Sequence, residues 1–507
     1  AIGTAANPFD IALSASGSLQ GTLTARALNE VYITSAGTIK VEAVSSQSRG
    51  VYLTAGGSIL DALNSDSAKI AANRIELTAS GGTIGSATNF LETDRLGVPS
   101  SESPLIGTLT ATASGSVYLH ETLGDFNVDR ITSSGGEVSL RAHQSILDAS
   151  TAAGESTAKP GVDIFANTNI SLTSDFGAIG VSGNDIDIDS ARAGAGTGVL
   201  KSTSYLGTNI IEVTGDLSVD AIGAGSAYTA FIAAPDGRII NSRSSGSNVL
   251  SGKAYLFAKN DIGAASKAFF TEVGNIEGQS TLGSAYITNT GAMTVGGVTG
   301  SDVGIVAMGR VTITTMSPLK IKTKIKSDGD ITLKANDSSG AGDDLDIGYD
   351  EAGNPVAGVE LESILGNVLL HAGDKFRLSN SALLRGARVE IHVDDSGSGG
   401  QGGSIELYGA IDSPTTDLYG GTGNDTIVIT ATSAPTLTSV FAGGGDDTIY
   451  VGSNATTASN AGGTVNQING KLIVNGQGGS DVLVVDETGE AAAIGLTLDR
   501  ETIAGTT

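Results

Sequence analysis

The stretch Gly420-Gly421-Thr422-Gly423-Asn424-Asp425-Thr426-Ile427-Val428 fills every specified position of the pattern G-G-x-G-x-D-x-U-x, in which U is a large apolar residue. Glycines let the backbone fold tightly enough to aim carbonyl oxygens inward, and the aspartate adds a hard anionic oxygen. The apolar residue after the aspartate anchors the following strand in a core. The pattern therefore predicts a calcium-binding turn that leads into a β-strand.

Two degraded copies of the pattern follow. Residues 442–450, AGGGDDTIY, lose only the first glycine, and residues 476–484, GQGGSDVLV, lose only the second. Three near matches in one region are hard to obtain by chance, so we expect three calcium-binding turns. The expected ligands are carboxylates of the aspartates and carbonyls of the glycines: Gly421, Gly423, Asp425, Gly443, Gly445, Asp446, Asp447, Gly479 and Asp481.

On these motifs the chain resembles the hemolysin-type calcium-binding (RTX) repeat family of large secreted bacterial proteins, over roughly residues 417–490. The resemblance implies calcium as the bound ion and a secreted, extracellular or bacterial cell-surface location. In that family the nonapeptides usually run in tandem, whereas the aspartates here stand at positions 425, 447 and 481. This wider spacing favours one turn per coil of a larger parallel β-helix, with an insertion such as residues 453–463 in the longer interval.

Composition limits what can hold the chain together. None of the 507 residues is cysteine, so disulfides, thiolate metal sites and cysteine nucleophiles are excluded. The apolar fraction is 39%, yet only 4% of residues are aromatic and none is Trp. This mixture suits thin, regularly stacked layers of aliphatic side chains better than a bulky core.

The net charge of −26 argues against nucleic acid and anionic membranes as partners and in favour of cations. Residues 417–507 carry 2 basic and 10 acidic side chains, and the acids fall inside glycine turns. The chain has no apolar run long enough to cross a bilayer, so we predict no membrane span. The chain starts at Ala1 without a signal segment and stops without a recognisable end, so we expect a processed or excised piece of something longer.

Repeats set the expected fold. Short alternating runs such as Val31-Tyr32-Ile33-Thr34 are bounded by glycine turns, and Val31-Tyr32 recurs as Val117-Tyr118. Ile84-Gly85 recurs as Ile262-Gly263, with Ile179-Gly180 near the middle. Gly85 and Gly263 are 178 residues apart, which corresponds to two repeat units of 89 residues. A quarter of one unit is about 22 residues, which equals the interval between the first two motif aspartates. We therefore predict an all-β, right-handed parallel β-helix (solenoid) of about 22 residues per coil.

The alternative is a row of tandem β-sandwich domains, because the repeat unit is close to the size of such a domain. The missing Trp and the missing Pro-marked linkers argue against it. Residues 1–400 also resemble the Ser/Gly/Thr-rich β-helical regions of filamentous-haemagglutinin-like adhesins. The expected organisation is a β-helical repeat region (1–395), a Gly/Ser loop or linker (396–403) and a calcium-binding region (404–507).

Two further acidic groups have open alternatives. The loop of residues 336–351 contains Asp337, Asp343, Asp344, Asp346, Asp350 and Glu351. It would either wrap a calcium ion or remain a solvated acidic loop. Asp185, Asp187 and Asp189 alternate with isoleucines and so share one face of a strand, which we expect to point outward into solvent.

A row of four lysines has both a catalytic and a structural explanation. Lys320, Lys322, Lys324 and Lys326 alternate with other residues as on one strand. In polysaccharide lyases built on β-helices, a basic residue beside calcium-binding acids removes a proton from the sugar. The favoured explanation is a solvated face or an edge that blocks aggregation. His120, His143, His371 and His392 have no metal-like spacing, and no nucleophile motif occurs, so we predict no enzyme activity.

The expected function is that of a rigid, calcium-stabilised structural segment of a giant secreted or cell-surface bacterial protein, acting in adhesion, cell-cell connection or an extracellular coat. The alternatives are a polysaccharide lyase-like β-helix enzyme and a self-assembling extracellular filament or sheath. The expected partners are calcium, a cell-surface glycan or protein receptor, and further copies of the chain.

Overall fold

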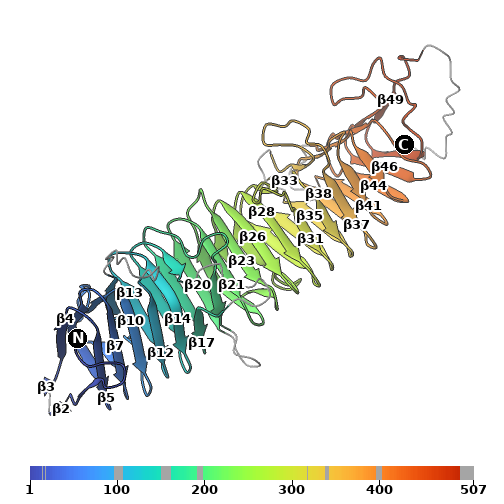
Figure 1. The fold of residues 1–507 in the computed structure, drawn as a ribbon. Coiled ribbons are helices and arrows are strands. Elements are labelled where there is room, and N and C mark those ends of the chain that lie inside the picture. Colours follow the sequence, from blue (N-terminus) through green and yellow to red (C-terminus); the bar gives the residue numbers. More distant parts are fainter. Residues whose placement is uncertain are drawn as a thin grey trace.

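A computed structural model describes residues 1–13, 15–16, 19–95, 107–149, 161–190, 198–316, 318–336, 342–394 and 402–490. Across these residues the chain forms 49 strands and no helix. The strands lie across the long axis of an elongated molecule and follow one another from the N-terminal to the C-terminal end (Figure 1). The expected all-β class is confirmed.

Most strands belong to two long sheets whose members alternate along the chain. The first sheet contains 26 strands, namely β1 (Phe9–Ile11), β5 (Val31–Ser35), β7 (Gly50–Ala55), β10 (Arg74–Ala79), β12 (Leu109–Ala113), β14 (Phe126–Ser133), β16 (Ile146–Asp148), β17 (Ile164–Ala166), β19 (Ile186–Asp189), β21 (Thr208–Glu212), β23 (Thr229–Ala234), β26 (Lys253–Ala258), β28 (Asn275–Ser280), β30 (Met293–Val295), β31 (Ile305–Ala307), β33 (Leu319–Ile321), β34 (Ile325–Ser327), β36 (Leu345–Ile347), β37 (Glu360–Ser363), β39 (Lys375–Leu378), β40 (Leu383–Arg385), β42 (Ser404–Leu407), β43 (Ala410–Asp412), β45 (Thr426–Ile429), β47 (Thr448–Val451) and β49 (Val482–Val485).

The second sheet contains the strands that come between them, namely β4 (Leu23–Ala27), β6 (Ile39–Ser46), β8 (Ile59–Asp61), β9 (Ile70–Ala72), β11 (Leu91–Arg95), β13 (Val117–Glu121), β15 (Val138–Ala142), β18 (Ile170–Ser174), β20 (Val199–Ser204), β22 (Leu217–Gly223), β24 (Ile239–Asn241), β25 (Val249–Leu250), β27 (Phe269–Glu272), β29 (Ala285–Asn289), β32 (Val311–Thr315), β35 (Ile331–Ala335), β38 (Val368–Ala372), β41 (Val389–Val393), β44 (Thr415–Tyr419), β46 (Leu437–Gly444) and β48 (Lys471–Gly478). A separate short hairpin pairs β2 (Ala15–Ser16) with β3 (Leu19–Gln20).

Parallel pairing decides between the two expected folds. Among the strand pairs of the described residues, β2 with β3 is the only antiparallel one, and both long sheets consist of parallel ladders. Tandem sandwiches are built from antiparallel strands, so that alternative is wrong. The architecture is parallel β-helix-like, with each strand paired to its counterpart about one coil before it and one coil after it.

The core consists of columns of aliphatic side chains that stack from coil to coil. Within each strand buried and less buried positions alternate, because successive side chains point to opposite faces of the sheet. Ile405, Ile427 and Ile449 are partners in consecutive ladders and are 0, 0 and 1% exposed. Such thin columns explain why a core with no Trp suffices.

Register shows where each coil is extended. Ser404 pairs with Thr426, Thr426 with Thr448, and Thr448 with Val482. These steps have the same lengths as those between the motif aspartates, so the spacing seen in the motif turns is the spacing of the strand ladders. Elsewhere the step varies, because Val31 pairs with Val51 but Ile75 pairs with Leu109.

The repeated glycines share one type of turn but do not lie along one edge of the molecule. The isoleucines before Gly85 and Gly263 bridge strands of the second sheet, whereas the isoleucine before Gly180 bridges strands of the first. Gly85, Gly180 and Gly263 have φ values of 65°, 60° and 67°, and the isoleucine before each one bridges both neighbouring coils. A Cβ at each would lie 2.2 to 2.5 Å from a carbonyl oxygen of the next coil, so only glycine fits. Gly3, with φ 67°, has the same surroundings and extends the series to the N-terminal end, which the repeat analysis did not show.

The predicted division at residues 396–403 falls mostly outside the described residues. Strand pairing continues across it, because β39 pairs with β42 and β41 with β44. Among the described residues, no helix has the length and apolarity of a membrane span.

Candidate cation site

The three motif turns stack on one another. Each turn immediately precedes a strand of the first sheet, and β45, β47 and β49 pair in register. The second sheet leads into the same turns, because β46 pairs with β48 as far as Gly444 with Gly478. The fold therefore brings Asp425, Asp447 and Asp481 to equivalent positions of successive coils, as the spacing predicted.

The three aspartates, together with Gly403 one coil earlier, form a column joined by hydrogen bonds. The amide of Gly403 donates to Oδ1 of Asp425 at 2.5 Å, and the amide of Asp425 donates to Oδ1 of Asp447 at 2.8 Å. The amide of Asp447 donates in turn to Oδ1 of Asp481 at 3.1 Å. Each carboxylate thus uses one oxygen to hold the coil before it. We call Asp425, Asp447 and Asp481 the aspartate ladder.

The residues before the aspartates form a second column, in which each side chain accepts a hydrogen bond from the coil after it rather than from the coil before it. Oδ1 of Asn424 accepts from the amide of Asp446, and Oδ1 of Asp446 accepts from the amide of Ser480, both at 2.8 Å. Asp446, an expected calcium ligand, is exposed and caps the backbone of the next coil. Its main role in the geometry is therefore to fix the spacing between two turns.

The glycines of the motifs are required by backbone conformation and by close stacking. Gly421 and Gly443 have φ values of 104° and 112°, while Gly423, Gly445 and Gly479 lie between 121° and 124°. A Cβ on Gly443 would lie 2.1 Å from the carbonyl oxygen of Gly421, and one on Gly445 would lie 2.1 Å from that of Gly423. The glycine carbonyls therefore point along the stack toward the next turn.

Burial and like charge make the aspartate ladder unfavourable by itself. Asp425 and Asp447 are 2 and 1% exposed, and Oδ2 of each has no hydrogen-bond partner among the described residues. Burial raises the pKa of Asp425 to about 7, and the charges of Asp447 and Asp394 contribute to the rise. Burial also raises the pKa of Asp447, with a contribution from Asp481. A bound cation would relieve both effects.

The donor set fits calcium better than a softer metal. It consists of carboxylate and carbonyl oxygens, the ligands that hard cations prefer. The described residues contain no group of three or more His, Cys, Asp or Glu side chains that could hold a metal ion together. Any ion in the stack would therefore rest on one or two carboxylates and on main-chain oxygens.

The acids of residues 336–351 are divided among separate partners. Asp344 pairs with Lys375 at 3.4 Å, and Asp346 receives two hydrogen bonds of 2.7 Å from Arg377. Asp350 accepts from the amides of Ala352 and Asn354 in its own turn. Asp337 lies outside the described residues. The described carboxylates form no group of three that could hold a metal ion, and Asp343 and Asp346 are buried, so the prediction of a wholly solvated loop is wrong.

The outward, solvated state predicted for the aspartates at 185, 187 and 189 is wrong for Asp187, which is 2% exposed. Ile186 and Ile188 face the core, so Asp187 points to the opposite face of β19 and is nevertheless covered there. Its amide donates at 2.9 Å to Asp163, another buried acid. Alternation fixed the face correctly, but it did not reveal that this face is covered.

The four lysines do not form a row on one strand. Lys320 lies in β33 and Lys326 in β34, with a corner between them. Lys322 pairs with Glu351 at 3.1 Å and Lys326 with Glu362 at 2.6 Å. These two ammonium groups are therefore engaged in surface ion pairs.

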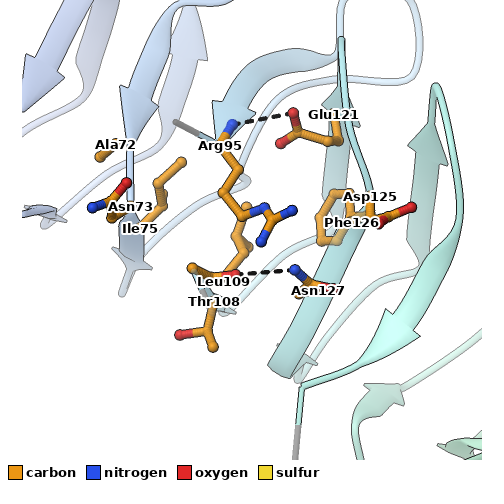
Figure 2. A pocket seen from close by; sticks show the side chains of 11 residues that line it. Ala72, Asn73, Ile75, Arg95, Thr108, Leu109, Glu121, Asp125, Phe126 and Asn127 are labelled. Atoms are coloured by element: carbon orange, nitrogen blue, oxygen red, sulfur yellow. Dashed lines mark hydrogen bonds between the residues drawn. The ribbon is translucent and has the colours of Figure 1, made fainter. Parts of the chain in front are cut away.

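A buried acid that the sequence analysis missed lies beside a small cavity of about 10 Å³, room for about one water (Figure 2). Glu121 is 2% exposed and accepts hydrogen bonds from the amide of Arg95 at 3.2 Å and from the hydroxyl of Thr93 at 3.0 Å. Burial raises its pKa to about 7. Alternation from Val117 through Leu119 already placed position 121 on the core face.

Two of the four histidines come together as part of an aromatic stack. The rings of His371 and His392 lie 4.7 Å apart and nearly parallel, and Tyr419 and Phe441 continue the stack at 4.4 and 5.1 Å. The faces of these rings cover one another, so the stack joins four coils and leads into the first two motif turns.

No protein-family model, no curated protein and no solved structure matches the chain.

Proposed function

We propose that this chain is a rigid, calcium-stabilised structural segment of a large secreted or cell-surface bacterial protein, acting in adhesion, cell-cell connection or an extracellular coat. The observation that carries the proposal is the aspartate ladder. Two of its three carboxylates, Asp425 and Asp447, are buried, and Oδ2 of each has no hydrogen-bond partner among the described residues, whereas Asp481 is exposed. Buried charges without a partner are costly, and a divalent cation is the counter-charge that this oxygen-rich corner accepts.

Calcium would lie between adjacent turns, held by Asp425, Asp447 and Asp481 with carbonyls of the motif glycines. When bound, the ion supplies positive charge that the described residues of the corner lack. The chain itself supplies the spacing, since the amide hydrogen bonds to Oδ1 hold the carboxylates one coil apart. Binding therefore couples the last coils to one another without any catalytic step.

Rigidity is the property that such a segment provides. We propose a right-handed parallel β-helix of about 22 residues per coil in the calcium-binding region, in which the backbone of each interior coil is paired on both sides. Paired backbone groups and stacked core columns resist bending, which suits a stalk or coat. Contacts with a surface glycan, a protein receptor or further copies of the chain would then use its outer faces.

The rival lyase function lacks support from two of the four lysines. Lys322 and Lys326 are engaged by Glu351 and Glu362, whereas a lyase base needs a free amine facing the substrate. The net charge of −26 also repels polyanionic sugars. We expect no turnover of pectin or alginate, measured by absorbance of the unsaturated product.

Calcium titration into chelator-treated protein tests the proposal. The melting temperature should rise with calcium concentration, because a ligand bound only by the folded state stabilises it by about 3 kcal/mol per site at a hundredfold excess over Kd. Proteolysis within residues 417–490 should slow in parallel. Magnesium at the same concentration is the control, since it demands a smaller octahedral site. Melting and proteolysis that both ignore calcium would refute the proposal.

A further inference from the structure

The coil before the first motif turn differs from the three motif coils in where it places its acid. The amide of Gly403 donates to Asp425, so Gly403 occupies the aspartate position of this coil. The pairing of His392 with Tyr419 places Asp394 opposite Gly421, a position that is glycine in the next two coils. This coil therefore carries its acid at the glycine position of the motif and a glycine at the aspartate position.

Asp394 has the same left-handed backbone conformation as the residues stacked on it. Its φ is 49°, and the residues at the equivalent position of the following coils, Gly421, Gly443 and Gln477, have φ of 104°, 112° and 67°. All four occupy the left-handed region, which aspartate tolerates better than most residues. The left-handed conformation at this position therefore begins one coil earlier than the motif itself.

The oxygens of Asp394 face the first motif turn. The residue is 7% exposed, and its Oδ2 accepts a hydrogen bond from the hydroxyl of Thr422 at 3.3 Å. The main-chain oxygens of Val393 and Asp394 lie 2.7 Å from the position that a Cβ would take on Gly421. A carboxylate, a hydroxyl and two carbonyl oxygens thus gather where only a glycine leaves space.

An independent observation comes from Asp425. Its Oδ2 is buried, has no hydrogen-bond partner among the described residues and lies 2.6 Å from the position of a Cβ on Gly420. The other oxygen of the same carboxylate accepts from the amide of Gly403, which lies on the same coil as Asp394, so the carboxylate of Asp425 reaches that coil. Burying two carboxylates at one corner is costly, and a bound cation offsets that cost.

We propose that Asp394 and Asp425, with the hydroxyl of Thr422 and the main-chain oxygens of Val393 and Asp394, bind an additional calcium ion one coil before the first motif turn. This site rests on the proposed function, since it uses the same ion and shares Asp425. It extends the cation-binding stack beyond the residues that the sequence motif marks, and all its donors are oxygens.

The test counts calcium ions bound to the full chain by equilibrium dialysis. Asp394→Gly removes the carboxylate and gives this coil the glycine of the motif coils, so the fold should persist, as circular dichroism would check. We expect this variant to bind one calcium fewer than the wild type. Asp394→Asn keeps the size of the side chain and should show the same loss. The matched control is Asp412→Asn, which removes an exposed acid one strand away and should keep the full count.

The outcomes separate this site from the proposed function. A full calcium count in both Asp394 variants, together with a reduced count in Asp447→Asn, would overturn the additional site and leave the motif sites standing. A wild-type chain that binds no calcium would overturn both. A lower count in Asp412→Asn equal to that of Asp394→Gly would attribute the loss to general charge and would also overturn the site.

Discussion

Two ladders of charged side chains run along this molecule. In both, parallel pairing stacks charged residues at equivalent positions of adjacent coils, but the two ladders differ in how the signs of the charges are arranged. In the aspartate ladder, parallel stacking places acid beside acid at Asp425, Asp447 and Asp481. In the first sheet, the same stacking places Lys320, Asp346, Arg377 and Glu406 beside one another in register, so that the sign of the charge alternates. We call this second series the alternating ladder.

The difference teaches what parallel stacking demands of charge. Equivalent residues of adjacent coils lie about 4.8 Å apart, so a column of charged groups is stabilised by alternating in sign or by recruiting a counter-ion. The alternating ladder is neutralised by its own residues, and its centre is the bidentate pair of Arg377 with Asp346. The aspartate ladder has no basic member, and we propose that calcium from the solution supplies its counter-charge.

Lys69 is a third arrangement, in which a lysine of the chain itself provides the positive charge at a buried acidic corner. Its side chain is 1% exposed, and its Nζ contacts the carbonyl oxygens of Ser65 and Ser67. Carboxylates of Asp61 and Glu92 lie 3.8 and 3.5 Å away. A tethered ammonium here does the work that we propose for calcium in the aspartate ladder.

Breaking the alternating ladder at its centre should have the largest effect. Arg377→Met leaves Asp346, which is 2% exposed, without its partner. Loss of one member of a buried pair costs about 4 kcal/mol, and calcium should not restore it. Urea unfolding with and without calcium measures both statements. Arg377→Met/Asp346→Leu should recover most of the loss, and a double variant as unstable as the single one would contradict the assignment.

Breaking the aspartate ladder should give an effect whose sign depends on calcium. Asp425→Asn keeps the oxygen that accepts from Gly403 but removes a buried charge, so without calcium it should raise the free energy of unfolding by about 1–2 kcal/mol at pH 8. With saturating calcium it should lower that free energy by about 3 kcal/mol, because a ligand is lost. Equal effects in both conditions would show that the ladder binds no ion.

A buried carboxylate that belongs to neither ladder sharpens the comparison. The pKa of Glu121 rises from 4.5 to about 7 on folding, so the folded state holds its proton more tightly. The stability from this group is therefore complete below pH 4.5 and is lost as the pH rises through 7. Glu121→Gln should remove that slope and stabilise the protein by about 2–3 kcal/mol at pH 8, without any response to calcium. Thermal melts from pH 4 to 8 measure this. If the carboxyl were ionised throughout, the variant and the wild type would show the same pH dependence of stability.

The smallest effect is expected at the exposed edge of the alternating ladder. Lys322→Ala breaks only the solvent-exposed pair with Glu351, which is worth less than about 0.5 kcal/mol. The matched variant Lys326→Ala, which breaks the pair with Glu362, should behave alike. Denaturation curves should nearly overlay the wild type. A loss well beyond what an exposed ion pair contributes would mean that these lysines hold the fold together.

Local pattern and period predicted the all-β class, the parallel stacking and the register of the motif turns. They did so because glycine turns and alternating aliphatic residues act within one coil, and the repeat interval then places the next coil. Contacts between coils were harder to predict. Asp346 and Arg377 are 31 residues apart, and nothing local marks them as a pair. Asp394 was missed because its coil has lost the motif.

The covering of outward faces was the other gap. The sequence places Asp187 on the side of the strand away from the core, but burial there depends on side chains from other coils. The lysine series from 320 to 326 looked like one strand because alternation cannot show a corner between Ile321 and Ile325. Both errors arise where tertiary packing overrides a local period.

The stacking of coils also determines how the molecule would respond to a pull on its ends. The hydrogen bonds between strands point along the long axis, whereas the strands themselves lie across it (Figure 1). Tension would therefore detach one coil at a time. Each detached coil adds to the length of the molecule the residues that lie between two paired strands. At about 3.4 Å per residue, a coil of about 22 residues lengthens the molecule by about 75 Å. The same segment would be stiff under small loads and extensible under large ones, and the motif turns, if linked by calcium as we propose, would be the last of their region to yield.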